Sequence, residues 1–90
     1  MHEISYKKIT IYEVNSFVKE LNEYLSEEKK SYALNMKDVE KIDMTAVQAI
    51  LSADKSCKEK GAQLLLYDLN NDNRDILELC GCNWLLGDNR

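Results

Sequence analysis

The sequence predicts an α/β sandwich, in which helices pack against a sheet of four to five strands. Two stretches show the helical spacing of apolar residues, one starting near Asn15 and the other near Ala46. Between them, the apolar side chains of Tyr32, Leu34 and Met36 occupy alternate positions, as in a strand. The run AQLLLY, residues 62–67, is almost entirely apolar, which is typical of a strand covered on both faces. Strands and helices that alternate in this way favour a parallel pair of strands joined by a helical crossover.

The first half of the chain is predicted to be strand, helix, strand. Residues 4–11 hold β-branched and aromatic side chains and are expected to contain strand structure, in one or two short pieces. A helix follows from about residue 15, with Asn15 as its N-cap. Its apolar residues fall at i, i+3, i+4, i+7, i+10 and i+11: Val14, Phe17, Val18, Leu21, Tyr24 and Leu25. The charged segment SEEKKS ends this helix before the strand at 32–36.

The second half is predicted to contain a helix at about 46–60, the apolar strand at 62–67 and a third helix at about 73–80. Lys58 and Lys60 suit the negative end of the second helix, and Gly61 suits the left-handed position after it. Gly81 ends the third helix. Residues 84–86 are expected either to form a last short strand or simply to pack.

Length and charge narrow the classes of protein. Ninety residues with 44% hydrophobic content predict one small folded domain spanning residues 1–90. The net charge of −4, without a basic cluster, argues against nucleic-acid binding, because phosphate contacts dominate that affinity. No apolar run approaches the length of a membrane span, and the N-terminus lacks the apolar core of a signal peptide. We therefore expect a cytoplasmic protein that does not insert into membranes.

The usual catalytic and metal-binding patterns are missing from the sequence. Three glycines, spread over the last third of the chain, cannot make a phosphate-binding loop, and a nucleophile would find only His2 as a base. Cys80 and Cys82 are close enough in sequence to suggest a metal or redox pair, but too few further ligands are present. We expect Cys80 to be a small core residue. The sequence thus predicts no enzyme, no cofactor and no metal site.

The segment after the third predicted strand partly matches a calcium loop. Asp68, Asn70 and Asp72 occupy the first, third and fifth ligand positions. The required glycine is replaced by Asn73, and the bidentate glutamate by Leu79. We interpret this segment as a loop whose short polar side chains cap the next helix.

The start of the second helix can be explained by local structure alone. Thr45 and Gln48 have the spacing of a capping box, in which each side chain bonds the backbone N–H of the other residue. Met44 would then precede the cap and lie opposite Ala49, and Asp43 would favour the positive helix end.

The order of the elements around this start resembles the STAS family, the domain of bacterial anti-sigma factor antagonists. In that family a strand ends in apolar–Asp–Ser/Thr–Ser/Thr/Ala–Gly–Leu, and a helix, a glycine, a buried strand and a helix ending in Leu-x-x-x-Gly follow. The matching residues are Ile42-Asp43-Met44-Thr45-Ala46-Val47, Gly61, Leu64 to Leu66, and Leu77 to Gly81. The resemblance covers residues 34–81 and extends more weakly over 9–33. It implies a STAS-like sandwich with a central mixed sheet of four to five strands and helices packed against it.

The resemblance also implies a function in bacterial signal transduction and transcription regulation. A kinase-like anti-sigma factor would dock over the N-terminus of the second helix, on Asp43, Met44, Thr45, Ala46 and Val47, and phosphorylate the residue after the Asp. That residue is Met44, which cannot accept phosphate. Either Thr45 is the phosphoacceptor or the switch is absent. We favour the second, because the capping box would occupy the Thr45 hydroxyl.

Two alternatives keep the same fold. Gln48 resembles the branch of the family that includes small STAS subunits of lipid-transport ATPases, so the partner could be a transport ATPase. A nucleotide-binding STAS domain would place its cleft at the carboxyl ends of the strands, near Asp43 and Asp68. Two acidic residues there disfavour phosphate binding.

Overall fold

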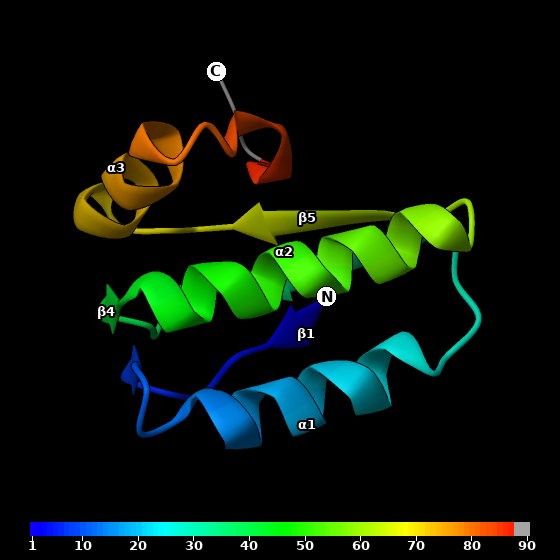
Figure 1. Ribbon diagram of the computed structural model, residues 1–90, viewed down its shortest axis with the longest axis horizontal. Helices are drawn as coiled ribbons and strands as arrows, with labels where there is room; N and C mark the ends of the chain where they lie inside the picture. The colour runs from blue at the N-terminus through cyan, green and yellow to red at the C-terminus, as the bar shows by residue number, and fades with distance from the viewer. Residues whose placement is uncertain (88–90) are drawn as a thin grey trace.

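The computed structural model describes residues 1–87 and places two long helices in front of a small sheet (Figure 1). In chain order the elements are β1 (His2–Glu3), β2 (Lys8–Ile9), α1 (Val14–Leu25), β3 (Ser31–Asn35), β4 (Lys41–Ile42), α2 (Met44–Glu59), β5 (Gln63–Tyr67), α3 (Asn71–Leu79) and the 3₁₀ helix η1 (Asn83–Leu85). The predicted α/β class and the predicted succession of the main helices and strands are confirmed.

Two small parallel sheets take the place of the single mixed sheet that the resemblance implied. One has the strand order β1-β3-β5, and the other pairs β2 with β4. Every strand pair within residues 1–87 is parallel, so the prediction of a mixed central sheet of four to five strands is wrong. The predicted crossover is confirmed, because β3 and β5 run parallel with Tyr32 opposite Leu64 and Leu34 opposite Leu66.

The N-terminal segment explains why the sheet divides. Residues 4–11 were expected to be strand in one or two pieces, and the structure has two pieces of two residues each. Leu34 pairs with His2 of β1, whereas Ile9 of β2 pairs with Ile42 of β4. Ile4, just after β1, and Ile9 are both buried, so this segment anchors in the core while it changes partner strand.

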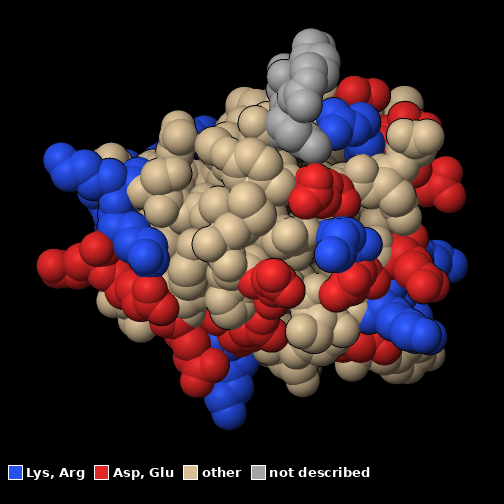
Figure 2. Space-filling view, turned by 180° about the vertical axis from the view of Figure 1, so that it is seen from behind, with Lys and Arg blue, Asp and Glu red and all other residues tan. Residues whose placement is uncertain are grey.

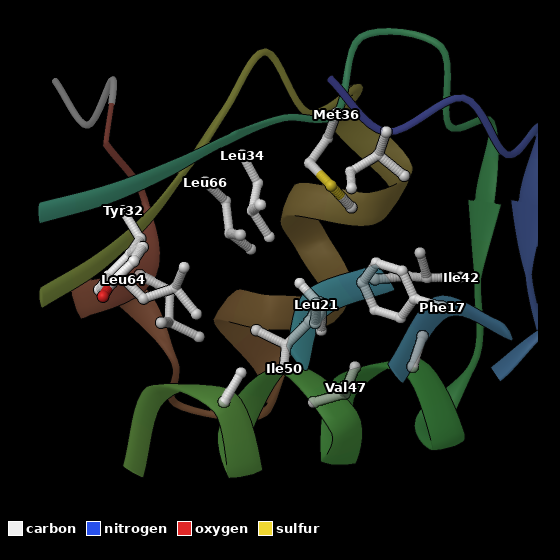
Figure 3. Close-up of a cluster of buried hydrophobic side chains, with 14 of the residues drawn as sticks. Phe17, Leu21, Tyr32, Leu34, Met36, Ile42, Val47, Ile50, Leu64 and Leu66 are labelled. Carbon is white, nitrogen blue, oxygen red and sulfur yellow. The ribbon is translucent and has the colours of Figure 1, made fainter. Parts of the chain in front are cut away.

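The core fills the space between α1, α2 and the inner faces of the strands (Figure 3). The strands alternate strictly: Tyr32, Leu34, Leu64 and Leu66 are at most 1% exposed, and the residues between them face away. The helices contribute Phe17 and Leu21 from α1 and Val47 and Ile50 from α2. The other two labelled side chains are Met36, just after β3, and Ile42 of β4. Burial of this kind contributes roughly 25 cal/mol per Å² of apolar surface, and it fixes how α1 and α2 lie on the sheet.

α1 begins slightly earlier than predicted. Its N-cap is Glu13, not Asn15, and the cap residue makes no side-chain hydrogen bond to the first turn. The Glu13 carboxylate instead accepts hydrogen bonds from the backbone and the hydroxyl of Thr10, so the turn before the helix is tied to the helix start. The Asn15 side chain is exposed.

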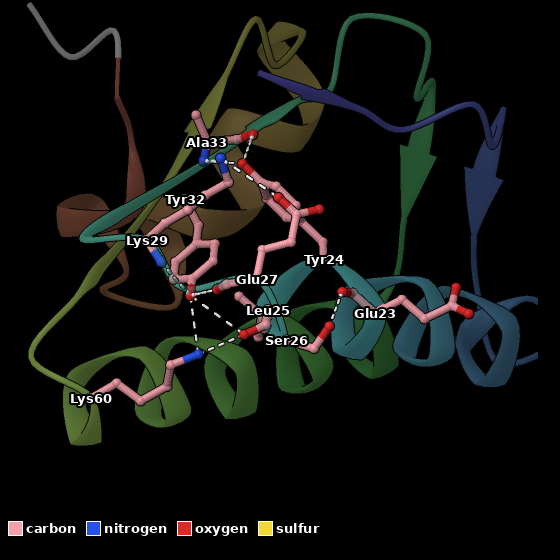
Figure 4. Close-up of polar contacts among 9 residues, drawn as sticks. All are labelled: Glu23, Tyr24, Leu25, Ser26, Glu27, Lys29, Tyr32, Ala33 and Lys60. Carbon is pink, nitrogen blue, oxygen red and sulfur yellow. Dashed lines mark hydrogen bonds and ion pairs between the residues drawn. The ribbon is translucent and has the colours of Figure 1, made fainter.

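The C-terminal ends of α1 and α2 are joined through Tyr32 and Lys60 (Figure 4). The Lys60 ammonium donates to the carbonyl of Leu25, at 2.5 Å, and to the Tyr32 hydroxyl, at 3.0 Å. The Tyr32 hydroxyl donates in turn to the carbonyl of Glu27. The Lys60 bond satisfies the Leu25 carbonyl, one of those that the end of α1 leaves open.

A tyrosine side chain closes the edge of β3 that β1 does not reach. The Tyr24 hydroxyl accepts from the Ala33 N–H at 3.1 Å and donates to the Ala33 carbonyl at 3.3 Å (Figure 4).

The side of the molecule behind the sheet has a broad uncharged area in the left half of Figure 2, with Lys, Arg, Asp and Glu side chains around it. Residues of the outer sheet face such as Leu65 and Tyr67 are half-buried.

The C-terminal segment adds α3 and η1 next to β5. Residues 84–86 were expected to form a short strand or to pack, and they do both in part, because Leu86 makes a single parallel bridge with Leu66. The Trp84 indole donates to the carboxylate of Asp54 at 3.0 Å, which fastens η1 to α2. Asp54 is 5% exposed and also pairs with Lys58 at 3.2 Å.

Candidate functional site

The N-terminus of α2 is organised by Asp43. α2 begins at Met44, and Asp43 is its N-cap, with the carboxylate Oδ1 accepting from the backbone N–H of Thr45 at 2.9 Å and of Ala46 at 3.2 Å. The predicted capping box is therefore wrong: Thr45 lies inside the first turn and is not the cap. The Thr45 hydroxyl is nevertheless engaged in a hydrogen bond, as expected, because it donates to the Asp43 carboxylate.

The second oxygen of the same carboxylate reaches another segment. Asp43 Oδ2 accepts from the backbone N–H of Ile11, in the turn between β2 and α1, at 3.0 Å. The bond from the Thr45 hydroxyl, with the backbone N–H bonds from Ala46, Ile11 and Thr45, holds the pKa of Asp43 below its usual value despite some desolvation. Asp43 is therefore an ionised link between α2 and the β2–α1 turn at neutral pH.

The five residues predicted to bind a partner differ in their accessibility. Met44 is 52% exposed, and Asp43 and Thr45 are half-buried. Ala46 and Val47 are both 0% exposed and belong to the core, so their side chains cannot contact a partner. They share the inward face of α2 with Ile50, which is also 0% exposed.

Residues that sequence reasoning did not include lie beside this helix start. Ile11 and Tyr12, in the β2–α1 turn, are 63% and 89% exposed. Cys80, at the end of α3, places its Sγ 3.8 Å from the Sδ of Met44 and is itself exposed. The sequence signal was present at Ile11 and Tyr12, since an apolar pair precedes the helical spacing of α1, but Ile11 was assigned to strand structure and Tyr12 to no element.

A groove of about 360 Å³ runs between α1 and α2, and neither Asp43 nor Asp68 lines it. Its walls are uncharged, with Val14, Val18, Leu21 and Asn22 on one side and Thr45, Gln48, Ala49, Ser52, Ala53 and Ser56 on the other. Thr45 thus lines the groove, and its hydroxyl bonds to Asp43. The groove offers a phosphate group no charged partner.

The cysteines and the polar loop take structural positions. Cys80 is exposed, so the expectation that it is a core residue is wrong, and Cys82, at 1% exposure, is the buried member of the pair. Burial raises the pKa of the Cys82 thiol.

In the polar loop before α3, Asn70 is the N-cap of α3 and accepts from the Asn73 N–H at 2.8 Å, which confirms the capping interpretation of this loop. Within residues 1–87, no three side chains of His, Cys, Asp or Glu cluster as a metal site would require.

The family model for the STAS domain matches residues 6–86, and the chain therefore belongs to the STAS family. A structure from Thermotoga maritima, of a protein proposed to be an anti-sigma factor antagonist, superposes with a TM-score of 0.79 at 23% identity and covers 93% of this chain and 74% of that one. A sulfate transporter family protein from Wolinella succinogenes superposes with a TM-score of 0.77 at 25% identity, over 97% of this chain and 70% of that one. None of the curated proteins compared matches the chain. No helix within residues 1–87 is both long and apolar enough to cross a membrane.

Proposed function

We propose that this protein is a non-enzymatic interaction module that binds a regulatory protein through the N-terminus of α2, as an anti-sigma factor antagonist would. The observation that carries the proposal is the position of Met44. It is the first residue of α2, is 52% exposed, and follows a carboxylate whose hydrogen bonds are made within the protein. Exposed methionine adapts its shape to an apolar partner, and methionine is enriched in interfaces.

We further propose that binding does not depend on phosphorylation at this site. Met44 occupies the position after the Asp, where the family resemblance places the acceptor, and a thioether cannot accept phosphate. Thr45, the other candidate acceptor, donates its hydroxyl to Asp43 and faces the α1–α2 groove. A phosphate on Thr45 would stand next to the Asp43 carboxylate, and like charges at that distance repel.

A second candidate function has some support from the comparisons. The similarity to a sulfate transporter family protein favours a STAS domain that works with a transporter. In this case the partner would be a transporter, contacted through the same exposed Met44, and the resemblance at Gln48 suggests a lipid-transport ATPase as that partner. The two candidates share one surface and differ in the partner.

The test is a tagged pull-down from the native host, followed by an affinity measurement with the purified partner. Recovery of a kinase-like anti-sigma factor supports the first function, and recovery of a transport ATPase supports the second. The variant Met44→Asp should weaken binding by about 30-fold or more, the effect of losing an interface residue worth roughly 2 kcal/mol. The fold should persist, since an acid at the first helical position is favoured by the helix dipole.

The matched control is Met44→Leu, which keeps an apolar side chain of similar size and should bind within about threefold of the wild type. Equal affinity of the Asp variant and the wild type would show that the partner docks elsewhere.

A further inference from the structure

Two sulfur atoms from distant parts of the chain meet beside the start of α2. The Sγ of Cys80, at the C-terminal end of α3, lies 3.8 Å from the Sδ of Met44, and the thiol donates to the thioether. Both residues are exposed. α3 and the start of α2 lie at the same end of the molecule in Figure 1. The contact joins residues 36 positions apart, so the fold creates it and no local sequence pattern announces it.

The cysteine pair that stands out in the sequence does not make this contact. Cys82 is 1% exposed, and its thiol donates to the carbonyl of Cys80 at 3.6 Å. Cys80 is exposed and has Met44 as its sulfur neighbour. The sulfur pair that solvent can reach is therefore Cys80 with Met44.

The donors at this place are sulfur atoms. Asp43, the residue before Met44, uses both carboxylate oxygens within the protein, Oδ1 for the first turn of α2 and Oδ2 for the Ile11 N–H. Nowhere in residues 1–87 do three side chains of His, Cys, Asp or Glu cluster, which excludes a zinc site with its usual ligands there. Methionine is not one of those four residue types, and here it adds a thioether. Thiolate and thioether sulfur select Cu(I), whereas magnesium, calcium and manganese take oxygen ligands.

The spacing of the two sulfur atoms fits one metal ion between them. With metal–sulfur bonds of about 2.3 Å, the length found for zinc thiolates, two sulfur atoms 3.8 Å apart subtend an angle of about 110° at the ion. That angle is far from linear, so the outer side of the ion stays open to a donor from solvent. Because the two sulfur atoms are adjacent before an ion arrives, binding requires little further ordering of the side chains.

We propose that Cys80 and Met44 form a binding site for one Cu(I) ion, with the Cys80 thiolate and the Met44 thioether as its protein ligands. The ion takes the place of the thiol proton between the two sulfur atoms. One Cu⁺ enters and one proton leaves to solvent, so the charge of the site is unchanged, and neither copper nor sulfur changes its oxidation state. The inference goes beyond the proposed function and needs no protein partner, although the ion and an apolar partner would compete for Met44.

The test measures transfer of Cu(I) to the purified, reduced chain in the absence of oxygen. The Cu(I) is supplied as its coloured complex with bicinchoninate, and the loss of colour measures the transfer. We expect the wild type to take up one equivalent and Cys80→Ser to take up none at the same concentrations. Met44→Leu keeps an apolar side chain of similar size but loses the sulfur, and should need about tenfold more protein for the same transfer.

The matched control is Cys82→Ser. Its hydroxyl can donate to the Cys80 carbonyl as the thiol does, so the end of α3 is preserved and the uptake should equal that of the wild type. Loss of uptake in this variant would mean that the two cysteines bind the ion together, which would overturn the proposal. Equal uptake by Met44→Leu and the wild type, or no uptake by the wild type, would overturn it as well.

The three methionines of the chain give a second readout within one protein. With carbon-13 in the methionine methyl groups, the Met44 signal should shift in the NMR spectrum when one equivalent of Cu(I) is added. The signals of Met36, which is 0% exposed, and of Met1 should stay in place. An unmoved Met44 signal, or equal shifts of all three, would refute the site. Because no partner is present, either result leaves the proposed function untouched.

Discussion

Removing the Asp43 carboxylate should destabilise the protein by a predictable and pH-dependent amount. Asp43→Ala loses the N-cap of α2, which costs about 1 kcal/mol, and the bond to the Ile11 N–H. That second bond is solvent-exposed, so we assign it about 1 kcal/mol, near the middle of the range for net hydrogen-bond contributions. The total of about 2 kcal/mol should lower the melting temperature by roughly 8–16 °C in a chain of this length.

The matched variant Asp43→Asn should lose only about 1 kcal/mol, because Asn is as good an N-cap as Asp. Urea unfolding at pH 7 measures both variants against the wild type. The pKa of Asp43 is lowered in the folded protein, so its stabilisation is fully present above the ordinary pKa of 3.8 and is lost as the pH falls through the folded pKa. The difference between wild type and Asp43→Ala should therefore shrink in unfolding experiments below pH 3.8. A difference under about 0.5 kcal/mol at pH 7, or one unchanged in acid, would refute this account of the helix start.

Three other substitutions test the fold. Tyr24→Phe removes the hydroxyl that serves both backbone groups of Ala33, and should cost about 1–2 kcal/mol and speed amide exchange at Ala33; unchanged exchange would contradict the contact. Gly61→Ala must adopt a φ of 74°, and should cost about 1 kcal/mol in urea unfolding, a loss that a substitution at exposed Glu59 should not produce. Trp84→Phe leaves the buried Asp54 carboxylate without its indole donor and should cost about 1–3 kcal/mol; a thermal melt identical to wild type would disprove that η1 is fastened there.

The main helices and central strands could be predicted from the sequence because their periodic patterns are long. α2 and β5 show the reason: one has apolar residues at helical spacing over its length, and the other is apolar from Leu64 to Tyr67. The division of the sheet could not be foreseen, since β1 and β2 have two residues each and are defined by which strand they pair with. Two residues are too few to show a periodic pattern, so the sequence does not indicate which strand such a short segment pairs with.

The candidate site was predicted in place but not in detail. Asp43 and Thr45 are both good N-cap residues, and local rules do not decide between two such residues spaced two apart. The structure places the cap at Asp43, where one carboxylate also reaches Ile11, a contact that joins residues 32 positions apart. Ala46 and Val47 lie on the inward face of α2. The spacing of Val47 with Ile50 had already indicated a core position.

The Tyr24 hydroxyl has a consequence for how copies of this protein meet at high concentration. A strand edge with free N–H and C=O groups is a template on which another chain can add a strand, and such addition begins aggregation. β1 pairs with Leu34 and Asn35 only, so Ala33 would present such a template just beyond it. One side-chain hydroxyl occupies both of its backbone groups. Resistance to intermolecular strand addition at this edge therefore comes from a helix side chain, where other sheets use a charged residue, a proline or a bulge.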